Sequence, residues 1–114
     1  MKKYIVLYHA PIGAWEQSGK ASKEEMEEGM KQWMVWAEKC GNLLVDMGSP
    51  LTNAITLKPG GVSKASEKML AGYSIMQGET RDQVIELLRD HPHLAWDAEC
   101  EIDLQECMPQ PGSQ

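Results

Sequence analysis

The 114-residue sequence contains no phenylalanine, few cysteines and fewer basic than acidic side chains. Eleven lysines and arginines against 17 aspartates and glutamates give a formal net charge of −6. A chain with this balance has no basic surface that could release counterions from nucleic acid or from an anionic bilayer. We therefore expect neither nucleic-acid binding nor membrane binding.

Disulfide, membrane and leader-peptide signals are also missing. The three cysteines, Cys40, Cys100 and Cys107, are an odd number without CxxC spacing, which favours a reducing cytoplasm over a disulfide framework. No apolar run approaches the roughly 20 residues of a membrane span. The opening apolar run is too short for a signal peptide. No phosphate loop, nucleophile elbow or other cofactor motif occurs, so no cofactor is expected.

What the sequence does contain is an alternation of strand-like and helical segments. Short β-branched or alternating runs predict strands at 3–9, 42–51, 53–61, 69–78 and 98–107. Helical periodicity predicts one helix over 22–41 and a second that begins at Thr80 and ends before Pro92. Residues 62–68 are polar, and we expect an exposed loop there.

The first helix has a capping box at Ser22 and Glu25. Its apolar stripe consists of Met26, Met30, Trp33, Met34 and Ala37. We interpret the methionines as core residues that fill irregular gaps. Trp36 lies off this stripe, so it either widens the buried face or contacts a partner.

The order β-α-β-β-β-α-β indicates an α+β domain of the ferredoxin-like class, with an antiparallel sheet and two helices on one face. We expect one domain over residues 1–108 and a flexible tail over 109–114.

Three stretches of this chain resemble the YCII-related family, whose DGPF-type members have the same length. They are "KYIVLYH", "AGYSIMQGETRDQVIELLRDHPHL" and "CEIDLQEC". The resemblance implies a dimeric α/β-barrel-like assembly, with a cleft between the sheet faces and the end of the second helix. It also implies acid/base chemistry by a His-Asp pair, as proposed in some branches; one relative is a dehydrochlorinase of a chlorinated aromatic.

Two family features are absent from this chain. The "DGPF" tetrapeptide is replaced by "GVSKASEK", and the histidine that other branches carry on the first helix is missing from "EEGMKQW". Of the His-Asp-Pro features, only Asp90, His91 and Pro92 match the family pattern.

The corner Asp90-His91-Pro92-His93 admits three interpretations. An extended chain at Pro92 would place both imidazoles on one face, where they could bind a metal with Asp90. The histidines could instead act in acid/base chemistry or contact a ligand. They could also only cap the end of a helix, where polar side chains bind free carbonyl groups.

Histidine also ends the first predicted strand, at His9, a position where a side chain can reach a cleft. It could act as a general base if a carboxylate holds its other nitrogen, either Asp90 or a member of the acidic row Glu99, Glu101 and Asp103. The alternatives are a buried histidine bonded to backbone and, for the acidic row, a solvated strand face.

These observations lead to one hypothesis and one alternative. We expect a small enzyme acting on an aromatic or keto-acid-like molecule in a dimer cleft, with His9, Asp90 and His91 as catalytic residues and no metal ligand assigned. Tyr73 and His93 are the expected ligand-binding residues; Tyr73 and Ser74 lie on opposite faces of their strand. The alternative is a non-catalytic homodimer that binds a small ligand or acts in a stress response.

Overall fold

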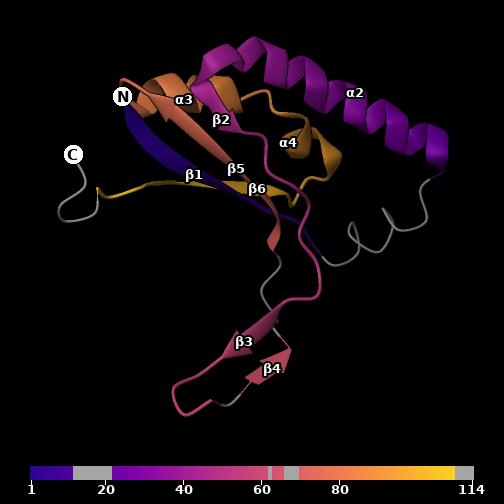
Figure 1. Cartoon of the computed structure of the whole chain (residues 1–114). Helices are drawn as coiled ribbons and strands as arrows, with labels where there is room; N and C mark the ends of the chain where they lie inside the picture. Colours follow the sequence, from indigo (N-terminus) through magenta and orange to yellow (C-terminus); the bar gives the residue numbers. More distant parts are fainter. Residues whose placement is uncertain (12–21, 62, 66–69, 110–114) are drawn as a thin grey trace.

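The computed structural model describes residues 1–11, 22–61, 63–65 and 70–109. Four strands form one antiparallel sheet in the order β2-β5-β1-β6. Their bounds are Lys2–His9 for β1, Leu44–Asp46 for β2, Leu70–Gly78 for β5 and Glu101–Glu106 for β6. Helices α2 (Lys23–Cys40) and α3 (Arg81–Leu88) pack on one side of this sheet (Figure 1). The predicted ferredoxin-like arrangement is confirmed at the level of this chain.

Strand β1 shows how the two faces of the sheet differ. Its even-numbered side chains, Tyr4, Val6 and Tyr8, are fully buried beneath the helices. Its odd-numbered side chains, which include Leu7 and His9, are only half-buried on the opposite face. No helix or strand in the described part of the chain covers that second face (Figure 1). We call it the open face of the sheet.

The buried face of α2 differs from the predicted methionine stripe. Met26, Met30 and Met34 are between 52% and 58% exposed, so their assignment to the core was wrong. Trp36 and Cys40 are buried instead. Burying the large indole removes more apolar area from water than a methionine would, and Trp36 also donates a hydrogen bond to α3, which fixes the rotation of the helix.

Residues 53–65 form a hairpin outside the main sheet. Strand β3 (Ile55–Leu57) pairs only with β4 (Ser63–Ala65), so the predicted strand at 53–61 is shorter and belongs to a second sheet. Three residues of the predicted loop 62–68 are therefore strand; its other residues lie outside the described ranges. The Pro-Gly-Gly turn reverses the chain, with Gly61 N–H bonded to the Lys58 carbonyl. We call residues 55–65 the arm.

The predicted strand at 42–51 is broken in the middle. Residues Gly41–Leu43 form a single 3₁₀ turn, and β2 ends at Asp46. Gly48 follows with φ +76°, and an added Cβ would lie 1.8 Å from the Tyr73 carbonyl oxygen. Pairing with β5 resumes only at Pro50, opposite Gly72.

Proline 92 ends one helix and begins another. Helix α3 stops at Leu88, as the sequence predicts, but Pro92 is the first residue of α4 (Pro92–Trp96), which the sequence analysis did not anticipate. Proline suits this position because its missing N–H would have no helical partner there. No described helix is long and apolar enough to cross a membrane. The predicted tail, apart from residue 109, lies outside the described residues.

Candidate functional site

His9 ends β1 on the open face, beside the acidic row of β6. Its Nε2 lies 2.9 Å from Oδ2 of Asp103, which β6 places diagonally across the strand pair because His9 is opposite Glu101 and Asp103 is opposite Leu7. The contact is close but lacks the alignment of a hydrogen bond. The His9 side chain is 33% exposed and that of Asp103 63% exposed. The Asp103 carboxylate is thus accessible and the His9 ring partly so, although His9 Nε2 itself is buried.

A recess of about 520 Å³ opens beside His9. It is lined by His9, Ala10, Pro11, Ala98, Glu99 and Glu101. A volume of this size is within the range of small-molecule sites. The recess thus brings one imidazole, apolar atoms and two further carboxylates together at one end of the sheet.

His93 binds the backbone of β1 at His9. Its side chain is buried, and its Nε2 lies 2.8 Å from the His9 carbonyl oxygen. Because a carbonyl only accepts, Nε2 carries the proton and donates it. Burial lowers the pKa of His93, so the ring is neutral at neutral pH. The bond ties α4 to the last residue of β1.

His91 is enclosed by aromatic rings. Its ring centroid lies 4.9 Å from that of Tyr8, 4.4 Å from Trp33 and 4.3 Å from Trp36. Nδ1 accepts a hydrogen bond from the His93 backbone N–H at 2.9 Å, which caps α4. Nε2 is buried and has no hydrogen-bond partner among the described residues. Removal from water lowers the His91 pKa to about 3.

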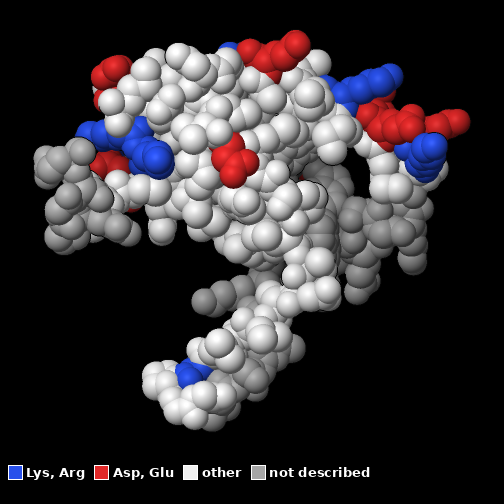
Figure 2. Space-filling model, in the orientation of Figure 1, with Lys and Arg blue, Asp and Glu red and all other residues white. Residues whose placement is uncertain are grey.

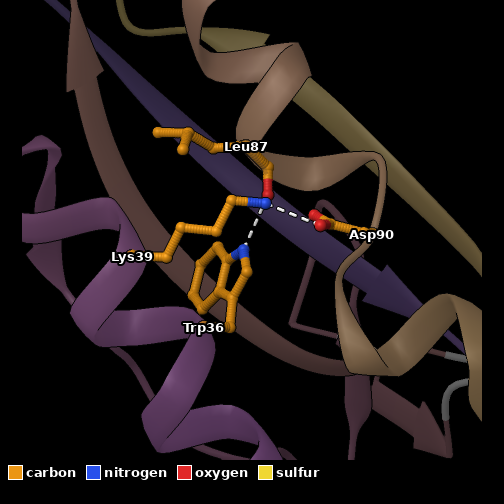
Figure 3. Close-up of polar contacts among 4 residues, drawn as sticks. All are labelled: Trp36, Lys39, Leu87 and Asp90. Carbon is orange, nitrogen blue, oxygen red and sulfur yellow. Dashed lines mark hydrogen bonds and ion pairs between the residues drawn. The ribbon is translucent and has the colours of Figure 1, made fainter.

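Asp90 lies on the surface and contacts neither His9 nor His91 through its carboxylate. Its Oδ2 is 2.6 Å from Nζ of Lys39 on α2, and that charge-assisted bond holds the pKa of the Asp90 carboxyl below its usual range. Next to it, Trp36 Nε1 donates to the Leu87 carbonyl oxygen at 2.7 Å (Figure 3). The two bonds join α2 to the end of α3. Asp90 lines a separate recess of about 400 Å³ that shares no residue with the one beside His9.

Strand β5 places its two candidate side chains on opposite faces, as expected. Tyr73 is half-buried on the open face, opposite Leu7. Ser74 is buried, 2.7 Å from the Tyr8 hydroxyl, and donates to the Met47 carbonyl. Burial raises the pKa of Tyr8 to about 12, so this phenol is neutral and belongs to the core.

The predicted residues therefore fall into three places. His9 and Tyr73 lie on the open face of the sheet, and His91 and His93 are buried. Asp90 lies on the surface, where it is paired with Lys39 of α2. Asp103 had been considered only as a possible partner of His9; the strict alternation of β6 is the signal that put it on the open face. No group of three described His, Cys, Asp or Glu residues is arranged to hold a metal ion.

The comparisons with known proteins find similarity in structure but not in sequence. No family model and no curated protein matches this sequence. The fold is similar to that of 5-chloro-2-hydroxyhydroquinone dehydrochlorinase from Burkholderia phenoliruptrix AC1100, solved in complex with 2,5-dihydroxybenzoquinone. The TM-score is 0.57 and the identity 13%, over 100% of both chains. At this identity the likeness shows a shared fold.

Proposed function

We propose that this chain is a small enzyme of the YCII-related type that uses His9 as an acid/base group on a small organic molecule. The observation that carries the proposal is the 2.9 Å approach of His9 Nε2 to Asp103 Oδ2, made by a histidine that also lines a recess. A histidine that lies beside a carboxylate and lines a recess is suited to transferring a proton to or from a bound molecule.

Roles for the other predicted residues follow from their surroundings. His91 is a poor proton carrier because it is enclosed and its pKa is about 3. The Asp90 carboxylate is paired with Lys39. We therefore assign to Asp103 the carboxylate that orients the His9 ring, a role for which the sequence left both Asp90 and the acidic row as candidates. His93 positions His9 through its backbone carbonyl rather than contacting the ligand.

The charge of the recess narrows the substrate class. Glu99 and Glu101 line it, and their carboxylates would repel the carboxylate of a keto acid. A neutral hydroxylated aromatic suits the same walls better, because its ring can pack on Ala10 and Pro11 while its hydroxyls donate to carboxylates. The structural neighbour acts on a molecule of this kind. Loss of HCl from a chlorinated hydroxyhydroquinone needs a proton delivered to the chlorine-bearing ring carbon and a base that takes a hydroxyl proton as chloride leaves. The ring product is a hydroxyquinone, so the step needs no external oxidant or reductant.

The proposed active form is a homodimer. Ile5 and Ile75 face each other on the open face, flanked by Leu7 and Tyr73. These side chains are apolar or aromatic and lie where no described element covers them, so a second copy stacked on this face would remove them from water. In that arrangement Tyr73 would line the space between the sheets and could contact a ligand.

The cell compartment proposed for this protein is the cytoplasm. Cys40, Cys100 and Cys107 are all free in the structure. Two of them are buried, and burial raises the pKa of both thiols, so they remain protonated and suit a compartment without oxidative pairing.

The alternative is a binding module without catalysis. The observation in its favour is that His9 Nε2 lacks an aligned hydrogen bond, whereas a working base is usually well oriented by its partner. Both functions predict a ligand in the recess; only the enzyme requires the imidazole for turnover.

Turnover and binding can be separated with two variants and one control. Purified protein would be tested against chlorinated and non-chlorinated hydroquinones, measuring chloride release, while 2,5-dihydroxybenzoquinone binding is followed by calorimetry. We expect His9→Gln to lower turnover by roughly 10²-fold or more and Asp103→Asn by about tenfold, with binding changed much less. Glu106→Gln, on the same strand but paired with Lys2, is the matched control and should keep full activity.

Binding that persists with no turnover of any tested phenol or keto acid would favour the binding module. Full activity in His9→Gln would remove the proposed chemistry altogether.

A further inference from the structure

The arm exposes apolar side chains that the body of the chain does not cover. Ile55 is 67% exposed and Leu57 70% exposed. The two residues are separated by one position on a strand, so they share a face. A two-stranded ribbon with three residues in each strand has little stability of its own in water. Such an arm is expected to dock on another surface.

Its position points to the open side of the sheet. In Figure 1 the helices lie above the sheet and the arm extends below it. Figure 2 shows open space between the body and the arm on that side. The arm also leaves the sheet at the end where His9 lies, because the first residue of β5, Leu70, pairs with His9. Arm and recess therefore belong to the same end of the molecule.

Charge distinguishes the arm from the rest of the chain. Residues 47–66 contain two lysines, Lys58 and Lys64, and no aspartate or glutamate, in a protein whose formal net charge is −6. Strand β6, at the other edge of the sheet, presents the exposed carboxylates of Glu101 and Asp103. The arm is thus complementary in charge to the opposite edge of an identical molecule.

A two-fold axis brings these surfaces together. Suppose that two sheets stack through their open faces and that the two-fold axis is parallel to the strands. Strand β2 of one copy then lies over β6 of the other. The ends of β1 that carry His9 lie at the same end of the dimer in both copies. The arm, which follows β2, then reaches the β6 edge of the second copy beside its His9. An axis perpendicular to the strands would put the arm at the opposite end, far from the acidic row.

We propose that the arm is a clasp that docks on a second copy of this chain, across the β6 edge beside the His9 recess. Ile55 and Leu57 supply the apolar contact, and Lys58 approaches Glu101 and Asp103 of the second copy. The clasp rests on the homodimer of the proposed function and adds to it that each recess is completed by residues from the other subunit.

Sedimentation of purified full-length variants tests the clasp. We expect Ile55→Ser with Leu57→Ser to raise the dimer dissociation constant at least tenfold. Val35→Ser is the matched control, because Val35 is equally exposed, at 67%, but lies on α2 away from the open face; it should leave the constant unchanged. Lys58→Glu should also weaken association, and adding Glu101→Lys should restore it. An arm variant with the wild-type constant, or no rescue by the charge swap, overturns the clasp.

A mixing experiment identifies the surface on which the arm docks. A spin label is attached at Thr56→Cys, on the face of β3 opposite Ile55 and Leu57, in a Cys107→Ser background, and this copy is mixed with unlabelled, ¹⁵N-enriched protein. Broadening of β6 amide signals in the ¹⁵N copy is the expected result. Broadening confined to a chain that carries both the label and ¹⁵N would show the arm docking on its own body, and the clasp would be wrong.

Failure of the clasp is distinguishable from failure of the proposed function. Ile75→Lys places a charge in the middle of the open face and should give a monomer if the sheets stack. A monomeric Ile75→Lys with arm variants that associate normally rejects the clasp alone. A wild-type protein that is monomeric at all concentrations rejects both the clasp and the dimer, while the His9 chemistry is still judged by turnover.

Discussion

At the scale of single residues, the protein contains three histidines in three electrostatic environments. His9 is partly exposed beside a carboxylate, His93 is buried but bonded to a carbonyl, and His91 is buried within a cluster of aromatic rings. Sequence position alone does not separate them, because two of them flank the same proline. The difference arises from the indoles and the Tyr8 ring that fold around His91 and exclude water.

The enclosed imidazole predicts a loss of stability in mild acid. The His91 pKa is about 3 in the folded protein and 6.5 for a solvated histidine, so folding opposes its protonation. Above about pH 6.5 the ring is neutral in both the folded and the unfolded chain, so the protein has its full free energy of unfolding. That free energy falls as the pH drops from 6.5 towards 3, because only the unfolded chain takes up the proton. The whole difference is at most roughly 5 kcal/mol, from about 1.4 kcal/mol per pKa unit.

Urea unfolding between pH 7 and 4 measures this effect. His91→Asn retains an acceptor for the His93 N–H but cannot titrate, so its unfolding free energy should fall less steeply with pH than that of the wild type. Equal slopes for the two proteins would show that other groups, such as carboxylates, control acid stability.

At the scale of helices and strands, the sequence predicted element types better than the contacts between them. Capping residues located both main helices: Ser22 accepts from the Glu25 N–H and Thr80 from the Gln83 N–H. The alternation of β6 distinguished the exposed face of that strand from its apolar face. These signals are local, so one sequence suffices to read them.

The wrong predictions for the buried face of α2 and for the loop at 62–68 depended on long-range packing. Helix α2 has two adjacent apolar stripes, and only the contact with Leu87, 51 positions along the chain, selects the one containing Trp36. The pairing of Asp90 with Lys39 spans the same separation. Likewise, residues 63–65 are polar enough for a loop and become a strand only because the turn before them brings them beside β3.

The choice of stripe on α2 gives a stability prediction. Trp36→Phe keeps an aromatic ring but leaves the Leu87 carbonyl without its donor, and we expect a loss of about 1–3 kcal/mol in unfolding free energy. Met30→Gln, on the exposed stripe of the same helix, should change it by less than about 0.5 kcal/mol. Denaturant titration of both variants tests this; a larger loss for Met30→Gln would mean that the methionines are covered in solution.

At the scale of the whole molecule, helices cover one face of the sheet, and no described helix or strand covers the other. The helices bury Tyr4, Val6 and Met76, whereas Ile5 and Ile75 on the reverse side remain half-exposed. The sequence of β1 alone could not show this imbalance, because half-buried and fully buried strand faces both appear there as one continuous apolar run. This imbalance is the observation that supports the proposed homodimer.

A thermal prediction follows for the intact protein. If two chains unfold together, the melting temperature should rise with protein concentration, by roughly 3–6 °C for each tenfold increase. Calorimetry at several concentrations measures it directly. Ile75→Lys should melt at a temperature independent of concentration, and the same independence in the wild type would indicate a monomer.

The bond from His93 to the backbone of His9 has a practical consequence. Trp96 occupies the same short helix, with its ring centroid 5.9 Å from that of His93, and is 40% exposed. A compound bound in the recess beside His9 would contact the end of β1, to which α4 is hydrogen-bonded through His93. We expect occupancy to change the indole emission of Trp96, measured as the difference between the wild type and Trp96→Phe, and this change can be used to screen candidate compounds before any reaction is known.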